Sequence, residues 1–533
     1  MLAVVATGLF AAACSDGADN GEDAATISSS SPVTTTSIAP ATTAAVSDDV
    51  AAPVTTSGPP VAEPRPMTVD WVDDRQRDGT VEVPLDHADP SAGATTVRVR
   101  RAPARNPDER IGVLMVNAGG PGTTGFALVD RAQRVFTPMV RDRFDIVAVA
   151  PRGTEATSGV VSCLPMDERA EFETSLDWSP DEPGEAESLD EHVAAAMQRC
   201  VDENVDLIEH VSTMDTVHDM AIVVGALGED QVSFLGTSYG APVGAAFATE
   251  YPDLTRAAVL DAANHPTVDP TSFATASVSG EEALLTRLYS ECDSDPDCPI
   301  TGDTQAAFER VARAADAQPL QNDPNLPPIN ENALAMTIFF HPDVYAGNPD
   351  VRLLAAIADA DDGDSSGLQR RFRDMIRFQS SLQAFHSILC SDWPSRDTDL
   401  SVDVEAQLRR DAPLLSSTFS GAPLQHRSSK MAVCGAWPVA PEPLPSPLSA
   451  AGAGPVLLLS ATGDVATPPA SAEQLRDELA DAALVYVESN RHGSYNASSA
   501  PEHRCATELV EQLLVDLDLP PDGTICASAS ENG

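Results

Sequence analysis

The chain has 533 residues, of which 42% are hydrophobic and 21% charged, so it can bury a sizeable core and is not disordered throughout. Its 81 acidic side chains outnumber the 32 basic ones and give a formal net charge of −49. An acidic surface of this kind repels phosphate backbones and anionic lipid. We therefore expect no nucleic-acid partner, and membrane contact only through a covalent anchor.

The N-terminus begins with an apolar run, Leu2 to Ala13, that is too short to span a bilayer and is followed by Cys14. Residues 1–14 therefore resemble a bacterial lipoprotein signal in which Cys14 takes a lipid anchor. No Lys or Arg precedes the run, so plain secretion and a chance apolar terminus stay open. Residues 15–66 are rich in Ser, Thr, Ala and Pro and predict a disordered tether. We expect an extracytoplasmic protein, lipid-anchored or secreted.

Residues 67–265 predict the first part of an α/β core. Alternation at 80–83 and 96–99 indicates an antiparallel hairpin. Short, continuous apolar runs follow, bounded by Gly, Pro, Asp or Asn, as in parallel strands buried on both faces. These runs are Ile111–Val116, Phe144–Ala150, Val232–Leu235, Ala257–Leu260, Val456–Leu459 and Leu484–Val487. The pattern predicts an α/β fold with a mostly parallel sheet.

The strand pattern stops after about residue 265 and resumes near 455, so residues 446–528 predict the second part of the core. Between them, residues 266–445 predict a helical cap, with helices over 281–292, 304–317, 331–340, 353–361 and 368–389. A helical block inserted between late strands is expected to cover the carboxyl edge of the sheet, where α/β active sites lie. A separate sequential domain is the alternative, and the return of buried strands favours insertion.

A candidate nucleophile lies in Gly236-Thr237-Ser238-Tyr239-Gly240, directly after a predicted strand and before a predicted helix. A serine on a sharp strand-to-helix turn needs glycines on both sides, because larger residues would clash. Such a turn lifts the serine oxygen clear of the sheet at a helix N-terminus, which favours negative charge. We predict that Ser238 is a catalytic nucleophile rather than part of an ordinary turn.

A serine needs a base, and the base needs an acid to orient it. In this fold class the acid follows the serine along the chain and the histidine comes last. Asp464 follows the predicted strand 456–459, and His492 follows the next one, so both fit. His503 is a rival base, but it opens a predicted helix and we expect it at the surface, and His265 precedes the acid. We predict a Ser238–His492–Asp464 triad.

The tetrahedral intermediate needs fixed N–H donors. After the predicted strand 111–116 the chain reads Asn-Ala-Gly-Gly-Pro-Gly at 117–122, where glycines let the backbone approach a substrate closely. We predict an oxyanion hole made by Gly119 or Gly120, with the amide of Tyr239 as the second donor.

Nine cysteines leave an even eight when Cys14 is set aside, which favours disulfides in an oxidising compartment. No cysteine or histidine spacing predicts zinc, so we expect no metal site and no cofactor. Eight cysteines allow 105 connectivities. Proximity in the sequence suggests pairing Cys163 with Cys200, Cys292 with Cys298, Cys390 with Cys434, and Cys505 with Cys526.

Several motifs together resemble the secreted actinobacterial tripeptidyl aminopeptidases, which are α/β-hydrolases related to proline iminopeptidases. The motifs are 117–122, Pro-Arg-Gly at 151–153, 236–240, Leu-Asp-Ala at 260–262, Gly-Asp-Val-Ala-Thr-Pro at 463–468 and Leu-Pro-Pro-Asp-Gly at 519–523. The resemblance covers about residues 67–526, implies an α/β-hydrolase fold with a TAP-like C-terminal part, and assigns the same triad. Ala118 and Ala150 depart from the family, which usually has proline and aspartate there; the latter change could alter the pairing of Arg152.

The resemblance implies a serine exopeptidase that releases tripeptides from free N-termini of peptide or protein substrates. An aminopeptidase needs a carboxylate for the substrate ammonium, and Asp392, beside Cys390 and Trp393, is the candidate among many cap acids, including Glu281 and Glu282. An esterase or lipase acting on envelope acyl esters is the alternative. A non-catalytic peptide-binding lipoprotein is a remote third.

Overall fold

The computed structural model describes residues 68–528, except 73–74, 162, 165, 176–177, 179–183, 266–269, 348–350, 380–383, 397–399, 420–430 and 496–499. The predicted signal segment with Cys14 and the predicted tether over 15–66 lie outside these residues. Among the described helices, none is both long enough and apolar enough to cross a membrane.

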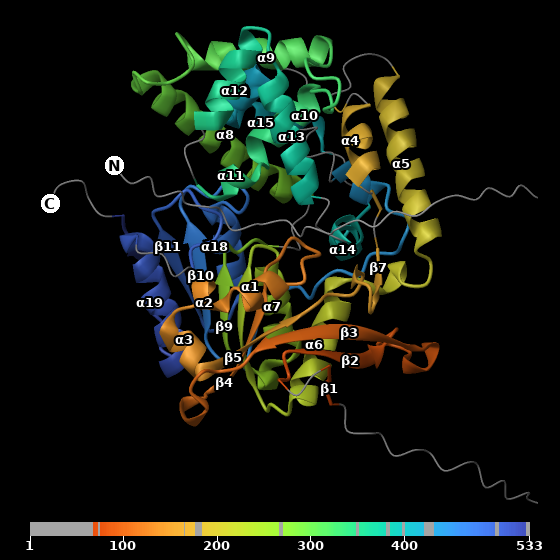
Figure 1. Ribbon diagram of the computed structural model, residues 1–533, viewed down its shortest axis with the longest axis vertical. Coiled ribbons are helices and arrows are strands. Elements are labelled where there is room, and N and C mark those ends of the chain that lie inside the picture. Colours follow the sequence, from red (N-terminus) through yellow and green to blue (C-terminus); the bar gives the residue numbers. More distant parts are fainter. Residues whose placement is uncertain are drawn as a thin grey trace, which may run out of the picture. The chain divides into compact units, whose positions relative to one another are not determined.

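A ten-stranded sheet organises the described residues, in the order β1-β2-β3-β5-β4-β8-β9-β10-β11-β12 (Figure 1). The strands from β5 through β4 to β12 pair in parallel, whereas β1, β2 and β3 form the antiparallel edge. Their bounds are β1 Asp70–Trp71, β2 Asp78–Pro84, β3 Ala94–Ala102, β4 Gly112–Asn117, β5 Phe144–Val149, β8 Val232–Thr237, β9 Thr255–Asp261, β10 Val456–Ala461, β11 Ala482–Val487 and β12 Thr524–Cys526. A separate small hairpin joins β6 Thr154–Glu155 to β7 Gly159–Val160.

The central strands are buried on both faces, as their continuous apolar runs predict. In β4 the alternating pairs Val113 and Met115, and Leu114 and Val116, belong to two different hydrophobic clusters. Side chains alternate between the faces of a strand, so each cluster covers one face of the sheet. The α/β fold with a mostly parallel sheet is thus confirmed.

The helices of the core flank this sheet and contribute to the two clusters. They are α1 Phe126–Asp130, α2 Ala132–Val135, α3 Pro138–Arg143, α6 Thr213–Leu227, α7 Gly240–Glu250, α18 Pro469–Glu478 and α19 Pro501–Asp516. Ser212 caps α6 reciprocally: its side chain accepts the Asp215 N–H, and the Asp215 carboxylate accepts the Ser212 N–H. Two further helices before α6, α4 Met166–Thr174 and α5 Glu185–Glu203, were not predicted.

The stretch between β9 and β10 is helical, as expected, but the single helix predicted over 368–389 is wrong, because α13 ends at Gln379 and α14 begins at Phe385. Its helices are α8 Pro270–Ser294, α9 Thr304–Ala317, α10 Glu331–Phe339, α11 Pro342–Tyr345, α12 Val351–Asp361, α13 Ser366–Gln379, α14 Phe385–Asp392, α15 Val402–Asp411 and α16 Pro413–Thr418. Most of them share a third hydrophobic cluster, which spans Ala274 to Phe419 and which we call the cap cluster. Ile388 and Cys390 of α14 instead join a cluster of the sheet, and Figure 1 shows α14 apart from α9, α10 and α12. The insertion therefore packs as two parts.

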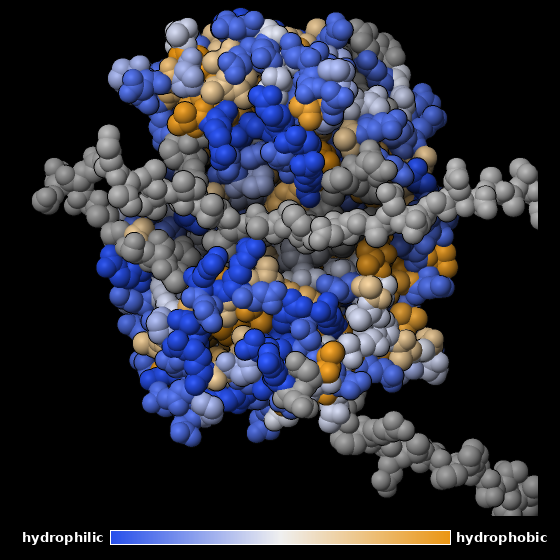
Figure 2. Space-filling model, viewed as in Figure 1, coloured by the Kyte–Doolittle hydropathy of each residue, from blue (hydrophilic) through white to orange (hydrophobic). Residues whose placement is uncertain are grey.

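The surface agrees with the acidic composition. In Figure 2 the visible face is mostly hydrophilic, with hydrophobic residues in small groups. The large hydrophobic side chains that are exposed among the described residues lie at scattered positions along the chain, such as Val72, Val205 and Ile525.

Candidate active site

The predicted nucleophile occupies a sharp turn between β8 and α7. Ser238 has φ of 59°, in the left-handed region that side chains other than glycine rarely adopt. Its N–H donates to the Asp261 carbonyl at 2.9 Å. An ideal Cβ on Gly236 would lie 2.0 Å from the Gly240 carbonyl oxygen, and one on Gly240 would lie 2.5 Å from that of Asn117. Both glycines are therefore required by close backbone approach, which holds Ser238 in its strained conformation.

The predicted acid and base are in contact at the carboxyl ends of the next parallel strands. Asp464 follows β10 and His492 follows β11, and the His492 Nδ1 donates to Asp464 Oδ2 at 2.9 Å. The Thr467 hydroxyl also donates to Asp464 Oδ2, at 2.8 Å, and the Ala466 N–H to Oδ1 at 2.9 Å. The aspartate is 3% exposed. Nδ1 therefore carries the proton that faces the acid, and Nε2 is the nitrogen left for a serine proton.

Two opposing effects set the pKa of His492. Burial favours the neutral ring and lowers the pKa, whereas the charge and hydrogen bond of Asp464 raise it, and the charge of Asp261 adds to this. The acidic partners prevail, so the pKa lies above the ordinary histidine value. The ring is thereby a stronger base than a buried histidine without a carboxylate.

A second buried carboxylate, Asp261 at the end of β9, joins the serine turn to the histidine loop. Its carboxylate accepts the N–H groups of Ser494 at 2.8 Å and Tyr495 at 3.0 Å, while its carbonyl accepts the Ser238 N–H. An ideal Cβ on Gly493 would lie 3.3 Å from Thr237 Cγ2, so the histidine loop lies against the residue before the serine. The three predicted groups thus share one edge of the sheet, although no hydrogen bond between Ser238 Oγ and His492 occurs among the described contacts.

Asp261, Thr467 and His503 support the site and were not assigned that role from the sequence. His503 was expected at the surface, which is wrong: it is 3% exposed and donates from Nδ1 to the Ser494 carbonyl at 2.9 Å. The position of Asp261 as the last residue of a buried strand was the signal available for it. The other rival base, His265, pairs with Glu478 at 3.0 Å.

The predicted oxyanion loop lies beside the amide of Tyr239, since an ideal Cβ on Gly119 would lie 2.7 Å from the Tyr239 nitrogen. The Gly119 N–H, however, donates to Asn117 Oδ1 at 2.8 Å. Gly119 is therefore corrected from a candidate donor to a structural turn residue. Gly120 and Tyr239 remain the candidate donors.

Comparisons with known proteins find similar hydrolases. A family model described as "TAP-like protein" matches residues 423–526. The chain is 28% identical over 472 residues to the serine protease Hip1 of Mycobacterium tuberculosis, covering 84% of this chain and 86% of that protein. It is 28% identical over 482 residues to carboxylesterase B of the same species, covering 85% and 86%. It is 25% identical over 433 residues to the tripeptidyl aminopeptidase of Streptomyces lividans, covering 76% of each.

This chain is a serine hydrolase of the α/β-hydrolase fold, with a TAP-like C-terminal segment. That segment contains β10, α18, β11, α19 and β12, and hence both loops that present Asp464 and His492. The fold and family resemblance predicted from the motifs are confirmed.

The cap of the hydrolase touches both loops. Tyr345 is the last residue of α11, and its carbonyl accepts the backbone N–H of His492 at 2.9 Å. The centroids of the Tyr345 and His492 rings lie 5.2 Å apart. An ideal Cβ on Gly280 of α8 would lie 2.6 Å from the Val465 carbonyl, next to Asp464. The inserted helices therefore contact the loops of both predicted groups through backbone atoms.

Asp392 was predicted to hold a substrate ammonium, and its contacts do not support that role. It is 1% exposed, and its oxygens accept the Tyr239 hydroxyl and the Thr213 N–H, the latter at 2.8 Å. Burial raises the pKa of this carboxyl to about 7, although the bonds from Thr213 and Tyr239 act against the shift. Because neighbouring groups of the chain occupy it, we correct Asp392 from a substrate contact to an internal one.

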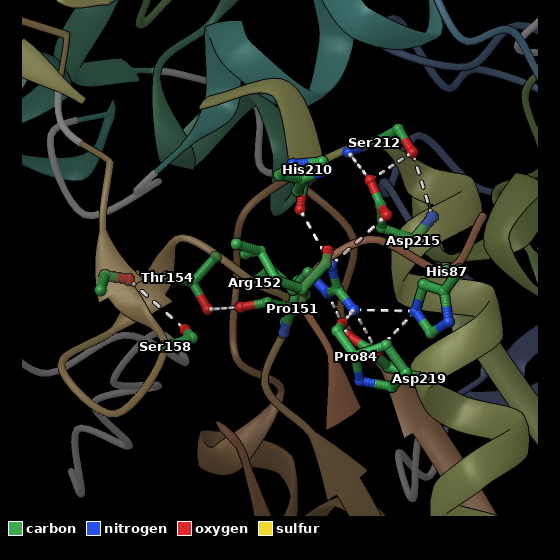
Figure 3. Close-up of polar contacts among 12 residues, drawn as sticks. Pro84, His87, Pro151, Arg152, Thr154, Ser158, His210, Ser212, Asp215 and Asp219 are labelled. Atoms are coloured by element: carbon green, nitrogen blue, oxygen red, sulfur yellow. Dashed lines mark hydrogen bonds and ion pairs between the residues drawn. The ribbon is translucent and has the colours of Figure 1, made fainter. Parts of the chain in front are cut away.

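Arg152 of the predicted Pro-Arg-Gly motif is a buried structural anchor (Figure 3). It is 0% exposed, and Nε and Nη2 donate to the two oxygens of Asp219 at 2.6 and 2.7 Å. It also donates to the carbonyls of Pro84 and Leu85, at 2.6 and 2.5 Å. Burial lowers the pKa of Arg152, but the combined effect of the paired Asp219 and the nearby Asp215 is larger and raises the pKa above the ordinary arginine value. The guanidinium therefore stays charged. Asp219 thus supplies the buried carboxylate partner that Ala150 cannot supply.

Four disulfides join the same pairs that sequence proximity suggested: Cys163–Cys200, Cys292–Cys298, Cys390–Cys434 and Cys505–Cys526. Such bonds are typical of proteins in oxidising compartments. The described residues hold no group of three or more His, Cys, Asp or Glu side chains that could bind a metal.

Proposed function

We propose that this hydrolase is a serine exopeptidase of the cell envelope, which releases short peptides, of the tripeptidyl type, from free N-termini. Ser238 attacks the scissile carbonyl, and His492 Nε2 takes its proton while Asp464 holds the ring by Nδ1. The amides of Gly120 and Tyr239 donate to the oxyanion. His492 then protonates the leaving amine, and water, activated by the same ring, hydrolyses the acyl-enzyme.

The contact between Asp464 and His492, on strand ends adjacent to the strained Ser238 turn, is the observation that carries this proposal. The names of two relatives, a serine protease and a tripeptidyl aminopeptidase, support a peptide substrate. The close contacts of the cap at His492 and Val465 support a site closed on one side, which suits a chain end better than the middle of a chain.

The extracytoplasmic location rests on the disulfides, and we extend it to a lipid anchor at Cys14 followed by a tether over 15–66. We also propose that the chain is organised as core residues 67–265 and 446–528 around a cap at 266–445, with α14 serving the core.

The test has two arms. A fluorophosphonate probe should label the protein and a Ser188→Ala control, whose serine is exposed on α5, but not Ser238→Ala. Tripeptidyl amide substrates should be cleaved only when their amino terminus is free. Labelling of Ser238→Ala contradicts the nucleophile. Turnover of acyl esters with no peptide bond cut indicates an esterase instead, as the name of the carboxylesterase relative allows.

A further inference from the structure

One buried carboxylate outside the predicted triad touches the nucleophile turn directly. Asp392 ends α14, and one of its oxygens accepts the hydroxyl of Tyr239, the residue that follows Ser238. The other oxygen accepts the backbone N–H of Thr213 at 2.8 Å, in the first turn of α6. Three elements from distant parts of the sequence therefore meet at one carboxylate, and the positive end of the α6 dipole faces it.

Bonds that do not involve Tyr239 fix the position of Asp392. Cys390, two residues earlier, is joined to Cys434. Arg396 donates from Nη1 to the Cys390 carbonyl and from Nη2 to the Val439 carbonyl, both at 2.6 Å. The N–H of Glu442 donates to the Ser391 carbonyl at 2.7 Å. The carboxylate is thus built into a rigid support before any substrate arrives.

Tyr239 is the residue through which this support can reach the chemistry. Its side chain is 7% exposed, and its backbone lies between the strained Ser238 and the first turn of α7. Its amide faces the 117–122 loop, because an ideal Cβ on Gly119 would lie 2.7 Å from the amide nitrogen. The Tyr239 side chain is held at its hydroxyl by Asp392 and at its backbone by the start of α7. The Ser238–Tyr239 peptide, whose N–H we assign to the oxyanion, therefore resists rotation.

We propose that Asp392 is a positioning residue that acts through Tyr239: by holding the tyrosine hydroxyl, it fixes the backbone amide that receives the oxyanion. This rests on Ser238 being the nucleophile, as proposed above. Transition-state stabilisation by such donors depends on their preset geometry, and small displacements weaken it strongly. The role differs from that of an amine anchor, because it serves every acyl substrate, with or without a free amino group.

The test compares Tyr239→Phe, Asp392→Asn and the double variant with the wild-type protein. Hydrolysis of p-nitrophenyl acetate is measured, because it reads serine acylation whatever the natural substrate is. Each single change should lower kcat about 10- to 100-fold with little change in KM. The double variant should be no less active than the less active single variant, because both changes act on the same contact.

A second measurement separates positioning from folding. Phenylboronic acid, which forms a tetrahedral adduct with an active serine, should lose affinity in parallel with kcat. Tyr289→Phe is the matched control, because it removes a buried tyrosine hydroxyl that bonds to Thr418 Oγ1 at 2.8 Å within the cap cluster. It should lower the melting temperature without changing kcat or boronate affinity.

Three results would overturn the proposal. Unchanged kcat and boronate affinity in Tyr239→Phe would leave the contact a purely structural one. Additive losses in the double variant would mean that Asp392 acts by another route. If Asp392→Asn raised KM only for peptides with a free amino terminus, Asp392 would instead be the contact for the substrate ammonium. Failure of the fluorophosphonate to label wild-type protein would contradict the proposed nucleophile and not this contact.

Discussion

The carboxyl edge of the sheet and the cap meet at His492, but they contribute to the site in different ways. The edge supplies side chains whose polar atoms are bonded to one another and to nearby backbone: Asp464 to His492 and Thr467, and Asp261 to the loop after the histidine. The cap reaches the same loops through backbone, with the Tyr345 carbonyl on the His492 N–H. The proposed catalytic groups therefore belong to the core, and the cap is suited to set which substrates enter.

Removal of the acid at the sheet edge should give the largest effect. Asp464→Asn should lower kcat/KM by about 10⁴-fold, because the amide favours the wrong imidazole tautomer. In the proposed mechanism neutral His492 is the base, so kcat/KM should fall as the pH drops through its raised pKa. Without the Asp464 charge, burial lowers that pKa and moves the acid limb to lower pH. Asp477→Asn, exposed on α18, is the control, and an unmoved limb would mean that another group orients the ring.

The second largest effect should come from breaking the buried ion pair between Arg152 and Asp219, and it should appear in the stability of the protein rather than in its rate. Arg152→Ala leaves the buried Asp219 with His87, at 2.9 Å, in place of the bidentate guanidinium, and should lower the free energy of unfolding by about 3–5 kcal/mol. Arg310→Ala in the cap removes an exposed bidentate pair with Asp361 and should shift the urea midpoint little. Equal shifts in the two variants would contradict the contrast between core and cap surface.

The smallest effect should come from the cap contact with the histidine loop. Gly347 has φ of 67°, and an ideal Cβ there would lie 2.8 Å from the Arg491 backbone nitrogen, next to His492. Gly347→Ala should cost roughly 1–2 kcal/mol of stability through the left-handed backbone and lower kcat/KM about tenfold by displacing the loop. Gly363→Ala, with φ of 98° and no atom within 4 Å of its Cβ, should show the strain alone. Equal kcat/KM in Gly347→Ala and Gly363→Ala would mean that the cap contact with the histidine loop does not affect catalysis.

The strands of the core were predictable because each is a short apolar run that is buried on both faces of the sheet, as in β4 and β10. The helices α4 and α5 were missed, since their sequences carry many charged residues, and two of those in α4, Arg169 and Glu173, are buried instead of apolar side chains. The rival His503 was misplaced because a histidine at a helix start gives no sign that a carbonyl will meet it. Likewise, nothing near Asp392 in the sequence indicates Tyr239, which lies 153 residues away.

The sequence by itself determined the parallel sheet, the family resemblance and the order of the predicted serine, acid and histidine, because these follow from local patterns along the chain. It only suggested the cysteine pairs, which the structure then joined. Only the tertiary structure decided which groups are already occupied: Gly119 by Asn117, Asp392 by Tyr239 and Thr213, and Arg152 by Asp219. A buried polar group must find a partner wherever the fold brings one, and that partner is set by packing rather than by sequence distance.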